Sequence, residues 1–244
     1  GFSEFMSSNG VHEYTFQTED PVFYFVAVER FLNKDGVLSK AWDQINFLNQ
    51  YTERAFKHLR QYKDQDLYKR ASYQDPETGV EVKTGGEIQG AVIDNPRKVR
   101  GARGYVNWEE FGSFPNGEDA WMTAKALAEQ GGVKFAMQIA WGTGGEQGPG
   151  IAAMEKIFTS PELYDCLPFE NCWLDGIQSN DHGFFFPVWA NMTKFMDKWG
   201  NTDHAKAIAY WEQEREKARK GSNLLMDKLI AEYPFTPMEA LMRL

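Results

Sequence analysis

The most constraining feature of the sequence is an uninterrupted apolar run from Val22 to Val28. A strand with one face in water alternates apolar and polar residues, whereas a strand covered on both faces is continuously apolar. The run therefore predicts a buried strand of a parallel sheet with helices on both faces. It is far too short to cross a bilayer, which requires ~20 apolar residues.

The rest of the chain alternates expected strands with expected helices, which is typical of an α/β fold. Strands are expected over 67–73, 80–83, 87–93, 104–108, 135–141 and 184–189, and helices over 3–16, 38–50, 52–62, 118–130, 203–220 and 222–232. The first two of these strands would form a small hairpin around Asp75–Gly79. We therefore predict a mostly parallel sheet flanked by helices, with a β-hairpin insertion and a helical carboxyl-terminal subdomain.

The composition suits one large folded domain with an appendage. Of the 244 residues, 42% are hydrophobic and 15% aromatic, enough to fill a core. The formal net charge is −9, whereas free-standing DNA-binding domains are usually basic. Any nucleic-acid contact is therefore expected to be local, or to come from parts of the protein outside this chain. No signal-peptide pattern opens the chain, so a cytoplasmic location is expected. Cys166 and Cys172 are expected to be free thiols, because the scattered histidines do not complete a zinc site.

Two carboxylates, Glu109 and Glu110, directly follow the expected strand 104–108. Ligands of open α/β sheets bind outside the carboxyl ends of the strands. Carboxylate oxygens suit Mg²⁺, a hard cation, and in ATP-hydrolysing P-loop proteins one acid helps to hold the metal while the next orients or activates water. The simpler explanation of the pair alone is two solvated residues at a strand end.

A glycine-rich segment, Gly142–Gly145, follows the expected strand 135–141, and Thr143 lies between its glycines. A threonine at such a position can contact a γ-phosphate or its attacking water and respond to the loss of the phosphate. The simpler explanation is a flexible loop in which glycine supplies positive φ angles.

Up to four cations precede the acidic strand, at Arg97, Lys98, Arg100 and Arg103. Guanidinium groups match the geometry of phosphates, so this turn can contact a nucleotide or DNA. A solvated basic turn explains the same residues more simply.

The order of these features (basic turn, strand, acid pair, helix, strand, Thr-Gly) resembles the large terminase family of tailed bacteriophages. The resemblance is carried by Val99–Gly104, Trp108–Asn116 and Ile139–Glu146. The middle segment is the most specific, because its acid pair is followed by Phe-Gly-Ser-Phe-Pro-Asn. Weaker likeness extends to 22–42, 184–187 and 233–240, and so covers most of the chain.

The resemblance implies the ATPase motor domain of a terminase, which couples ATP hydrolysis to translocation of double-stranded DNA into a capsid. Glu109 would be the Walker B acid, which holds Mg²⁺ through ATP, and Glu110 the catalytic carboxylate. Arg100 or Arg103 would act as an arginine finger toward a neighbouring subunit.

By the same resemblance, Thr143 and Gly144 would form the coupling motif. ATP and Mg²⁺ would be the cofactors. The partners would be double-stranded DNA, a portal protein, a small terminase subunit and further copies in a homo-oligomeric ring, in the cytoplasm of the host cell.

The sequence departs from the family pattern at two points. The Walker B acid is usually Asp, and Glu109 is one methylene longer, which alters its distance to a metal. No G-x-x-x-x-G-K-[ST] phosphate loop occurs. Gly1-Phe2-Ser3-Glu4 resembles the end of a deviant family loop, with Gly1 at the nucleotide and Ser3 as the Mg²⁺-binding hydroxyl. Gly1 can equally be a remnant of cloning.

On this interpretation, residues 1–202 form the motor domain without its first strand and most of its phosphate loop. Residues 203–244 form a helical linker that leads toward a nuclease domain. This chain alone is then expected to hydrolyse ATP negligibly. Two alternatives stay open, namely a fragment of another P-loop ATPase such as a helicase, and a non-catalytic α/β interaction module.

Overall fold

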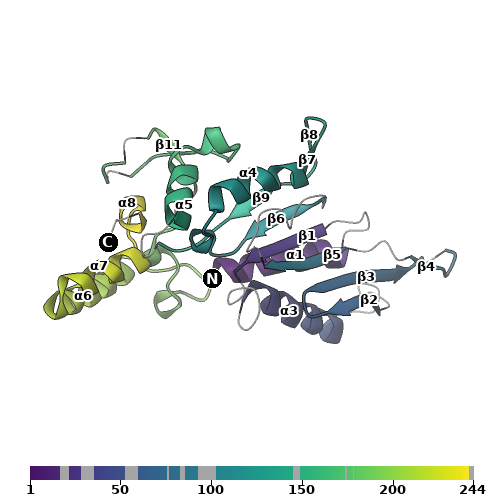
Figure 1. Cartoon of the computed structure of the whole chain (residues 1–244). Coiled ribbons are helices and arrows are strands. Elements are labelled where there is room, and N and C mark those ends of the chain that lie inside the picture. The colour runs from purple at the N-terminus through teal and green to yellow at the C-terminus, as the bar shows by residue number, and fades with distance from the viewer. Residues whose placement is uncertain are drawn as a thin grey trace. The chain divides into compact units, whose positions relative to one another are not determined.

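The computed structural model describes residues 1–16, 22–28, 36–52, 60–75, 77–82, 86–92, 103–144, 149–173, 175–177 and 179–241. The chain divides into two compact units, 1–142 and 143–244 (Figure 1). Each unit is described by itself. Within the described residues, no helix has the length and apolar character needed to cross a membrane.

A seven-stranded sheet forms the centre of the first unit, in the order β2-β3-β5-β1-β6-β9, with β4 paired to β3. Its strands are β1 Val22–Ala27, β2 Arg60–Gln65, β3 Tyr68–Gln74, β4 Glu81–Val82, β5 Glu87–Val92, β6 Tyr105–Trp108 and β9 Gln138–Ala140. Strand β1 pairs in parallel with β5 and β6, and β6 pairs in parallel with β9. The strands β2, β3 and β4 add antiparallel pairs at the other side. The predicted mostly parallel sheet, with the strands around 22–28, 105–108 and 135–141 as neighbours, is confirmed.

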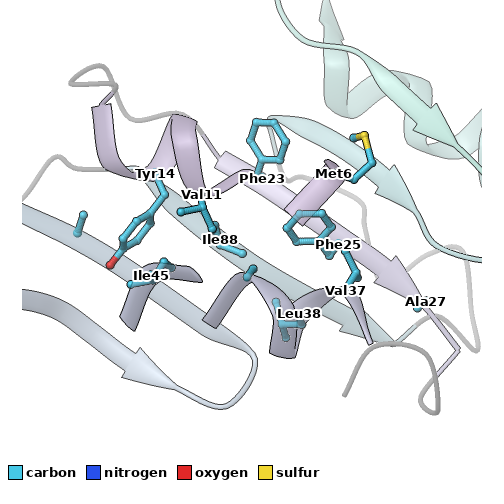
Figure 2. Packing of buried hydrophobic residues seen from close by; sticks show 12 residues of the cluster. Met6, Val11, Tyr14, Phe23, Phe25, Ala27, Val37, Leu38, Ile45 and Ile88 are labelled. Atoms are coloured by element: carbon cyan, nitrogen blue, oxygen red, sulfur yellow. The ribbon is translucent and has the colours of Figure 1, made fainter. Parts of the chain in front are cut away.

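Two helices, α1 (Phe2–Phe16) and α3 (Val37–Tyr51), pack on one face of this sheet (Figure 2). Alternate residues of β1, Phe23, Phe25 and Ala27, point toward them, as the period of two in a strand requires. The helices contribute side chains at near-helical spacing, namely Met6, Val11, Tyr14, Val37, Leu38, Ala41 and Ile45. This cluster is the main hydrophobic core.

The intervening residues of β1 face the opposite side of the sheet, where α4 (Gly117–Ala128) packs. Val26 is paired in register with Trp108, which is fully buried and meets Phe111 and Phe114 edge to face. Both faces of β1 are therefore covered, which explains why its sequence lacks polar positions.

One glycine fixes the close approach of β1 and β6. Gly104 has φ +148°, and a Cβ atom added there would lie 2.2 Å from the carbonyl oxygen of Val22. Only glycine combines this backbone angle with so little space.

The second unit is built mainly from helices. It contains α5 Pro149–Thr159, the two-residue strands β10 Phe169–Glu170 and β11 Asp181–His182, and then α6 His204–Gly221, α7 Asn223–Glu232 and α8 Pro237–Ala240. The last three helices begin at capping side chains, Asp203, Ser222 and Thr236, each of which accepts a hydrogen bond from a backbone N–H of the first turn. The helical carboxyl-terminal segment is therefore confirmed.

An ion pair fastens α6 to α8. Arg215 donates to both carboxylate oxygens of Glu239, at 2.9 and 2.7 Å, and its guanidinium lies 3.7 Å from the ring centre of Phe235. The two compact units divide at residue 142, whereas the sequence places a functional boundary at residue 202, which stays a prediction.

Two predicted elements are wrong. Residues 60–62, expected at the end of a helix, belong to β2, because pairing with β3 outweighs local helical preference; 53–59 lie outside the described residues. The stretch 184–189, expected as a buried strand, has no ladder, and Phe184 and Phe186 are exposed. Its aromatic residues mimic a buried strand, but Pro187 cannot donate to one.

The helix expected over 118–130 ends at Ala128 instead. The last two residues of the expected range form the strand β7 (Glu129–Gln130), which pairs with β8 (Val133–Lys134). Gly131 and Gly132 make the turn with φ angles of +61° and +80°. The glycine pair, expected as a helix stop, turns a hairpin instead.

Candidate active site at the carboxyl ends of the parallel strands

Strands β1, β6 and β9 run in parallel, so their carboxyl ends meet at one edge of the sheet. Glu109 follows β6 directly, and its backbone N–H donates to the carbonyl of Val26 at 2.8 Å. Trp141 follows β9, donates to the carbonyl of Trp108 at 3.1 Å and accepts from the N–H of Phe111 at 2.9 Å. The backbone on either side of the acid pair is thus pinned to both neighbouring strands.

A residue from the start of the chain completes this edge. The Ser3 hydroxyl donates to Glu109 Oε1 at 2.6 Å, although 106 positions separate the two residues. Ser3 lies in the first turn of α1, where Gly1 precedes the helix and its carbonyl accepts from the N–H groups of Glu4 and Phe5. A helix amino terminus carries free N–H groups and partial positive charge, and so favours anions.

Glu109 is almost fully buried, with 5% of its surface exposed. Burial raises the pKa of its carboxyl above the ordinary value, as does the nearby charge of Glu110, while the hydrogen bond from Ser3 lowers it. Its second oxygen, Oε2, is buried and has no hydrogen-bond partner. An unpartnered buried carboxylate oxygen is costly in the folded protein and is the kind of atom that a bound cation or donor would satisfy.

Glu110 adopts a conformation that is rare for residues other than glycine, with φ 49° and ψ 56°. It precedes a short 3-10 turn, Phe111–Ser113, and its carbonyl accepts from the N–H of Ser113 at 2.8 Å. Gly142 lies close by, since a Cβ atom added there would be 3.2 Å from Glu110 Oε2. Strained backbone of this kind clusters at functional sites, where neighbouring structure holds it in place.

Thr143 and Gly144 belong to the second unit, where Gly144 packs against backbone: an added Cβ would lie 2.3 Å from the carbonyl oxygen of Ala240 and 2.7 Å from that of Ala231. Arg100 lies outside the described residues.

Arg103 is exposed and lies before the amino end of β6, with its guanidinium 4.4 Å from the ring centre of Phe135. Glu109 follows the carboxyl end of the same strand. At ~3.3 Å per strand residue, the two are ~20 Å apart. Arg103 therefore does not contact Glu109 of the same chain, and its role as an arginine finger in trans remains a prediction.

Two aromatic residues at the site, Phe2 and Trp141, were not predicted from the sequence as site residues. The ring of Phe2 packs on that of Trp141, with centroids 5.5 Å apart. The Trp141 indole Nε1 is buried and, like Glu109 Oε2, has no hydrogen-bond partner. Trp141 stands two residues before Thr143, but no pattern in the sequence marks it as part of a site. Among the described residues, no group of three or more His, Cys, Asp or Glu side chains could hold a metal by itself.

These features define a class of protein. A mostly parallel sheet flanked by helices, with acids after a central strand and a helix amino terminus at the same edge, matches the topology of a P-loop NTPase-like α/β fold, one of the open α/β sheets that bind ligands at this edge.

The comparison with solved structures narrows this class to one fold, that of the ATPase domain of phage large terminases. The large terminase ATPase domain of Thermus phage P74-26 superposes with a TM-score of 0.59 at 14% identity, over 97% of this chain and 84% of that one. An arginine-to-alanine mutant of the same domain gives 0.60 at 12% identity, over 100% and 85%. The HK97 bacteriophage large terminase gives 0.50 at 10% identity, over 100% of this chain and 44% of that one. No protein-family model and no curated protein sequence matches the chain.

Proposed function

We propose that this chain is the ATPase motor domain of a phage DNA-packaging terminase, which couples ATP hydrolysis to translocation of double-stranded DNA into a capsid. The observation that carries the proposal is the 2.6 Å hydrogen bond between Ser3 and Glu109. It joins a hydroxyl at a helix amino terminus to an acid at the end of a central parallel strand. A hydroxyl and a Walker B acid are the two protein groups that hold Mg²⁺ in P-loop NTPases.

The residues present fit a Mg²⁺–ATP complex. Ser3 offers a hydroxyl oxygen, and Glu109 offers a buried carboxylate whose one side-chain hydrogen bond among the described residues comes from Ser3. Both are oxygen ligands, which a hard cation requires. The first-turn N–H groups of α1 and Gly1 would lie beside the phosphates. Mg²⁺ would neutralise charge that develops on the β- and γ-phosphate oxygens.

Glu110 would orient and activate the attacking water. Its backbone is left-handed, and Gly142, which has no side chain, leaves room beside its carboxylate. Because Glu109 and Glu110 occupy different environments, one nearly fully buried and the other half-buried, they can serve as a metal ligand and a base.

Thr143 and Gly144 would couple hydrolysis to motion. Gly144 lies against the carbonyl oxygens of Ala231 and Ala240, so any side chain at this position would displace the end of α7 and α8. A movement of the backbone at Thr143, the preceding residue, would therefore pass through Gly144 to these helices. Residues 203–244 would be the linker between the motor domain, 1–202, and a nuclease domain.

Either Arg100 or Arg103 would act as an arginine finger in trans. Arg103 is exposed before the amino end of β6, whereas Glu109 follows its carboxyl end, and this separation supports a contact with the nucleotide of a neighbouring subunit in a ring. Such a guanidinium contributes ~10³–10⁵-fold in rate. The further partners would be double-stranded DNA, the portal protein and the small terminase subunit, in the host cell cytoplasm.

The proposal is tested by DNA-stimulated ATP hydrolysis in the full-length protein that carries this chain. Glu110→Gln should abolish turnover and keep nucleotide binding, while Ser3→Ala should weaken Mg²⁺-dependent binding. The matched control for Ser3 is Ser8→Ala, which removes a hydroxyl from an exposed position of the same helix. The control for Glu110 is Glu77→Gln, in an exposed turn. Absence of nucleotide binding in the unaltered protein would contradict the proposal and favour a non-catalytic module.

A further inference from the structure

Two buried polar atoms without partners lie at the same site. Glu109 Oε2 is an acceptor and the Trp141 indole Nε1 is a donor, and neither makes a hydrogen bond. Trp108 and Ala140 are paired in register on the parallel strands β6 and β9, and the Trp141 N–H donates to the carbonyl of Trp108 at 3.1 Å, so Glu109 and Trp141, the next residue after each strand, are neighbours. The indole donor and the carboxylate acceptor therefore come from adjacent strand ends, and the small lowering of the Glu109 pKa by the Trp141 side chain agrees with this placement.

The position of the Trp141 ring is fixed from both sides. Its backbone is hydrogen-bonded to Trp108 at one end and to Phe111 at the other, at 3.1 and 2.9 Å. Phe2, the first residue of α1, packs against the ring. The indole N–H thus belongs to a part of the site with little freedom to turn elsewhere.

The Ser3 hydroxyl holds only one of the two Glu109 oxygens. If that hydroxyl turned to Mg²⁺, as the proposed function requires, Glu109 would lose its only hydrogen bond from a side chain among the described residues. A buried carboxylate without a donor is strongly disfavoured, and a donor already beside it would replace the loss.

We propose that Trp141 is a positioning residue for Glu109, whose indole N–H donates to Oε2 and holds the carboxylate toward the metal when Ser3 turns away. This role suits the longer Glu in place of the usual Asp, because a longer side chain needs an additional contact to fix its end. The inference about the metal rests on the proposed function, whereas the contact between Trp141 and Glu109 does not.

The contact is tested by nuclear magnetic resonance of the indole N–H groups of this chain, which has eight tryptophans. Trp141→Phe keeps a ring for Phe2 to pack on, removes one signal and thereby identifies it. Glu109→Ala should move this signal upfield and speed its exchange with solvent, while Glu110→Ala should leave it nearly unchanged. Unchanged signals from the other tryptophans show that each variant is folded. If Glu109→Ala does not fold, Glu109→Gln should give a smaller shift in the same direction.

The role toward the metal is tested by nucleotide binding to the full-length protein, with ADP in the presence and absence of Mg²⁺. Residues that orient metal ligands typically change metal affinity 10–100-fold, so Trp141→Phe should weaken the Mg²⁺-dependent part of binding by about 10-fold or more. Binding without Mg²⁺ should not change. The control Trp199→Phe alters an exposed tryptophan of the other unit and should have no effect.

A Trp141 signal that ignores Glu109→Ala, or responds equally to both Glu→Ala variants, overturns the contact. Mg²⁺-dependent binding that survives Trp141→Phe overturns the positioning role. If the unaltered protein binds no nucleotide, the proposed function fails, while the indole measurement still decides whether Trp141 contacts Glu109.

Discussion

Replacing Glu110 by glycine should stabilise the protein relative to alanine at the same position, because this residue holds a left-handed backbone. Its φ of 49° and ψ of 56° are maintained by the turn Phe111–Ser113 and by the hydrogen bond from Ser113 N–H to its carbonyl. Glu110→Ala and Glu110→Gly both remove the carboxylate. The difference between them therefore isolates the backbone.

The magnitude follows from two opposing contributions. A non-glycine residue in the left-handed region costs about 1–2 kcal/mol, and this cost disappears with glycine. Glycine loses about 0.5–1 kcal/mol more conformational entropy than alanine on folding. We therefore expect Glu110→Gly to be more stable than Glu110→Ala by ~0.5–1 kcal/mol.

The free energy of unfolding is measured by urea denaturation of this chain. The matched control is Ala126→Gly, at an exposed position inside α4, where glycine should destabilise by ~1 kcal/mol. Opposite signs at positions 110 and 126 support the reasoning. A loss of stability at Glu110→Gly equal to that at Ala126→Gly would show that residue 110 is not strained, and would remove this argument for a functional position.

Three further outcomes are expected. Gly104→Ala should lower the free energy of unfolding, measured by urea denaturation, by about 3 kcal/mol or more, because backbone strain and a clash with the Val22 carbonyl add together. Gly131→Ala, at a position with positive φ but open space, should lower it by only ~1 kcal/mol. Equal losses would contradict the close approach of β1 and β6. Burial raises the folded-state pKa of Glu109 above its ordinary value of 4.5, so its contribution to stability is full below pH 4.5 and is lost as the pH rises through the folded value; Glu109→Gln should therefore gain stability relative to the unaltered chain as the pH rises above 4.5, and a pH-independent difference would refute the burial of this carboxyl. Burial raises the pKa of Cys166 to about 11, so iodoacetamide at pH 8 should modify exposed Cys172 first, and mass spectrometry of the peptides would reveal the reverse order.

The central sheet could be predicted because burial on both faces leaves a direct mark on composition. The run at 22–28 has no polar position, and the acid pair after 105–108 marks where that strand ends. The strand β2 could not be predicted in this way, because its polar residues owe their extended form to pairing with β3. The strand predicted over 184–189 was wrong for the opposite reason, because its apolar residues indicated burial whereas Phe184 and Phe186 are exposed.

Short sequence motifs predicted individual residues of the candidate site, but not the contacts between residues that are far apart in the sequence. Glu109 and Ser3 were each predicted from a short motif. They contact each other because α1 begins at the edge of the sheet where β6 ends. The motif order also placed Arg103 beside Glu109 in sequence, but an intervening strand carries the two to opposite ends. Trp141 was missed because its importance lies in the position of one indole N–H beside a carboxylate that is 32 residues earlier in the sequence.

The most direct test of the account is a crystal structure of the full-length protein with Mn²⁺, in place of Mg²⁺, and a non-hydrolysable ATP analogue. The anomalous signal of Mn²⁺ locates the metal independently of the nucleotide. The account predicts the metal against Ser3 Oγ and the Glu109 carboxylate, with the phosphates at the amino terminus of α1 and Glu110 facing the γ-phosphate. A nucleotide bound away from α1, or a metal that contacts neither Ser3 nor Glu109, would contradict it.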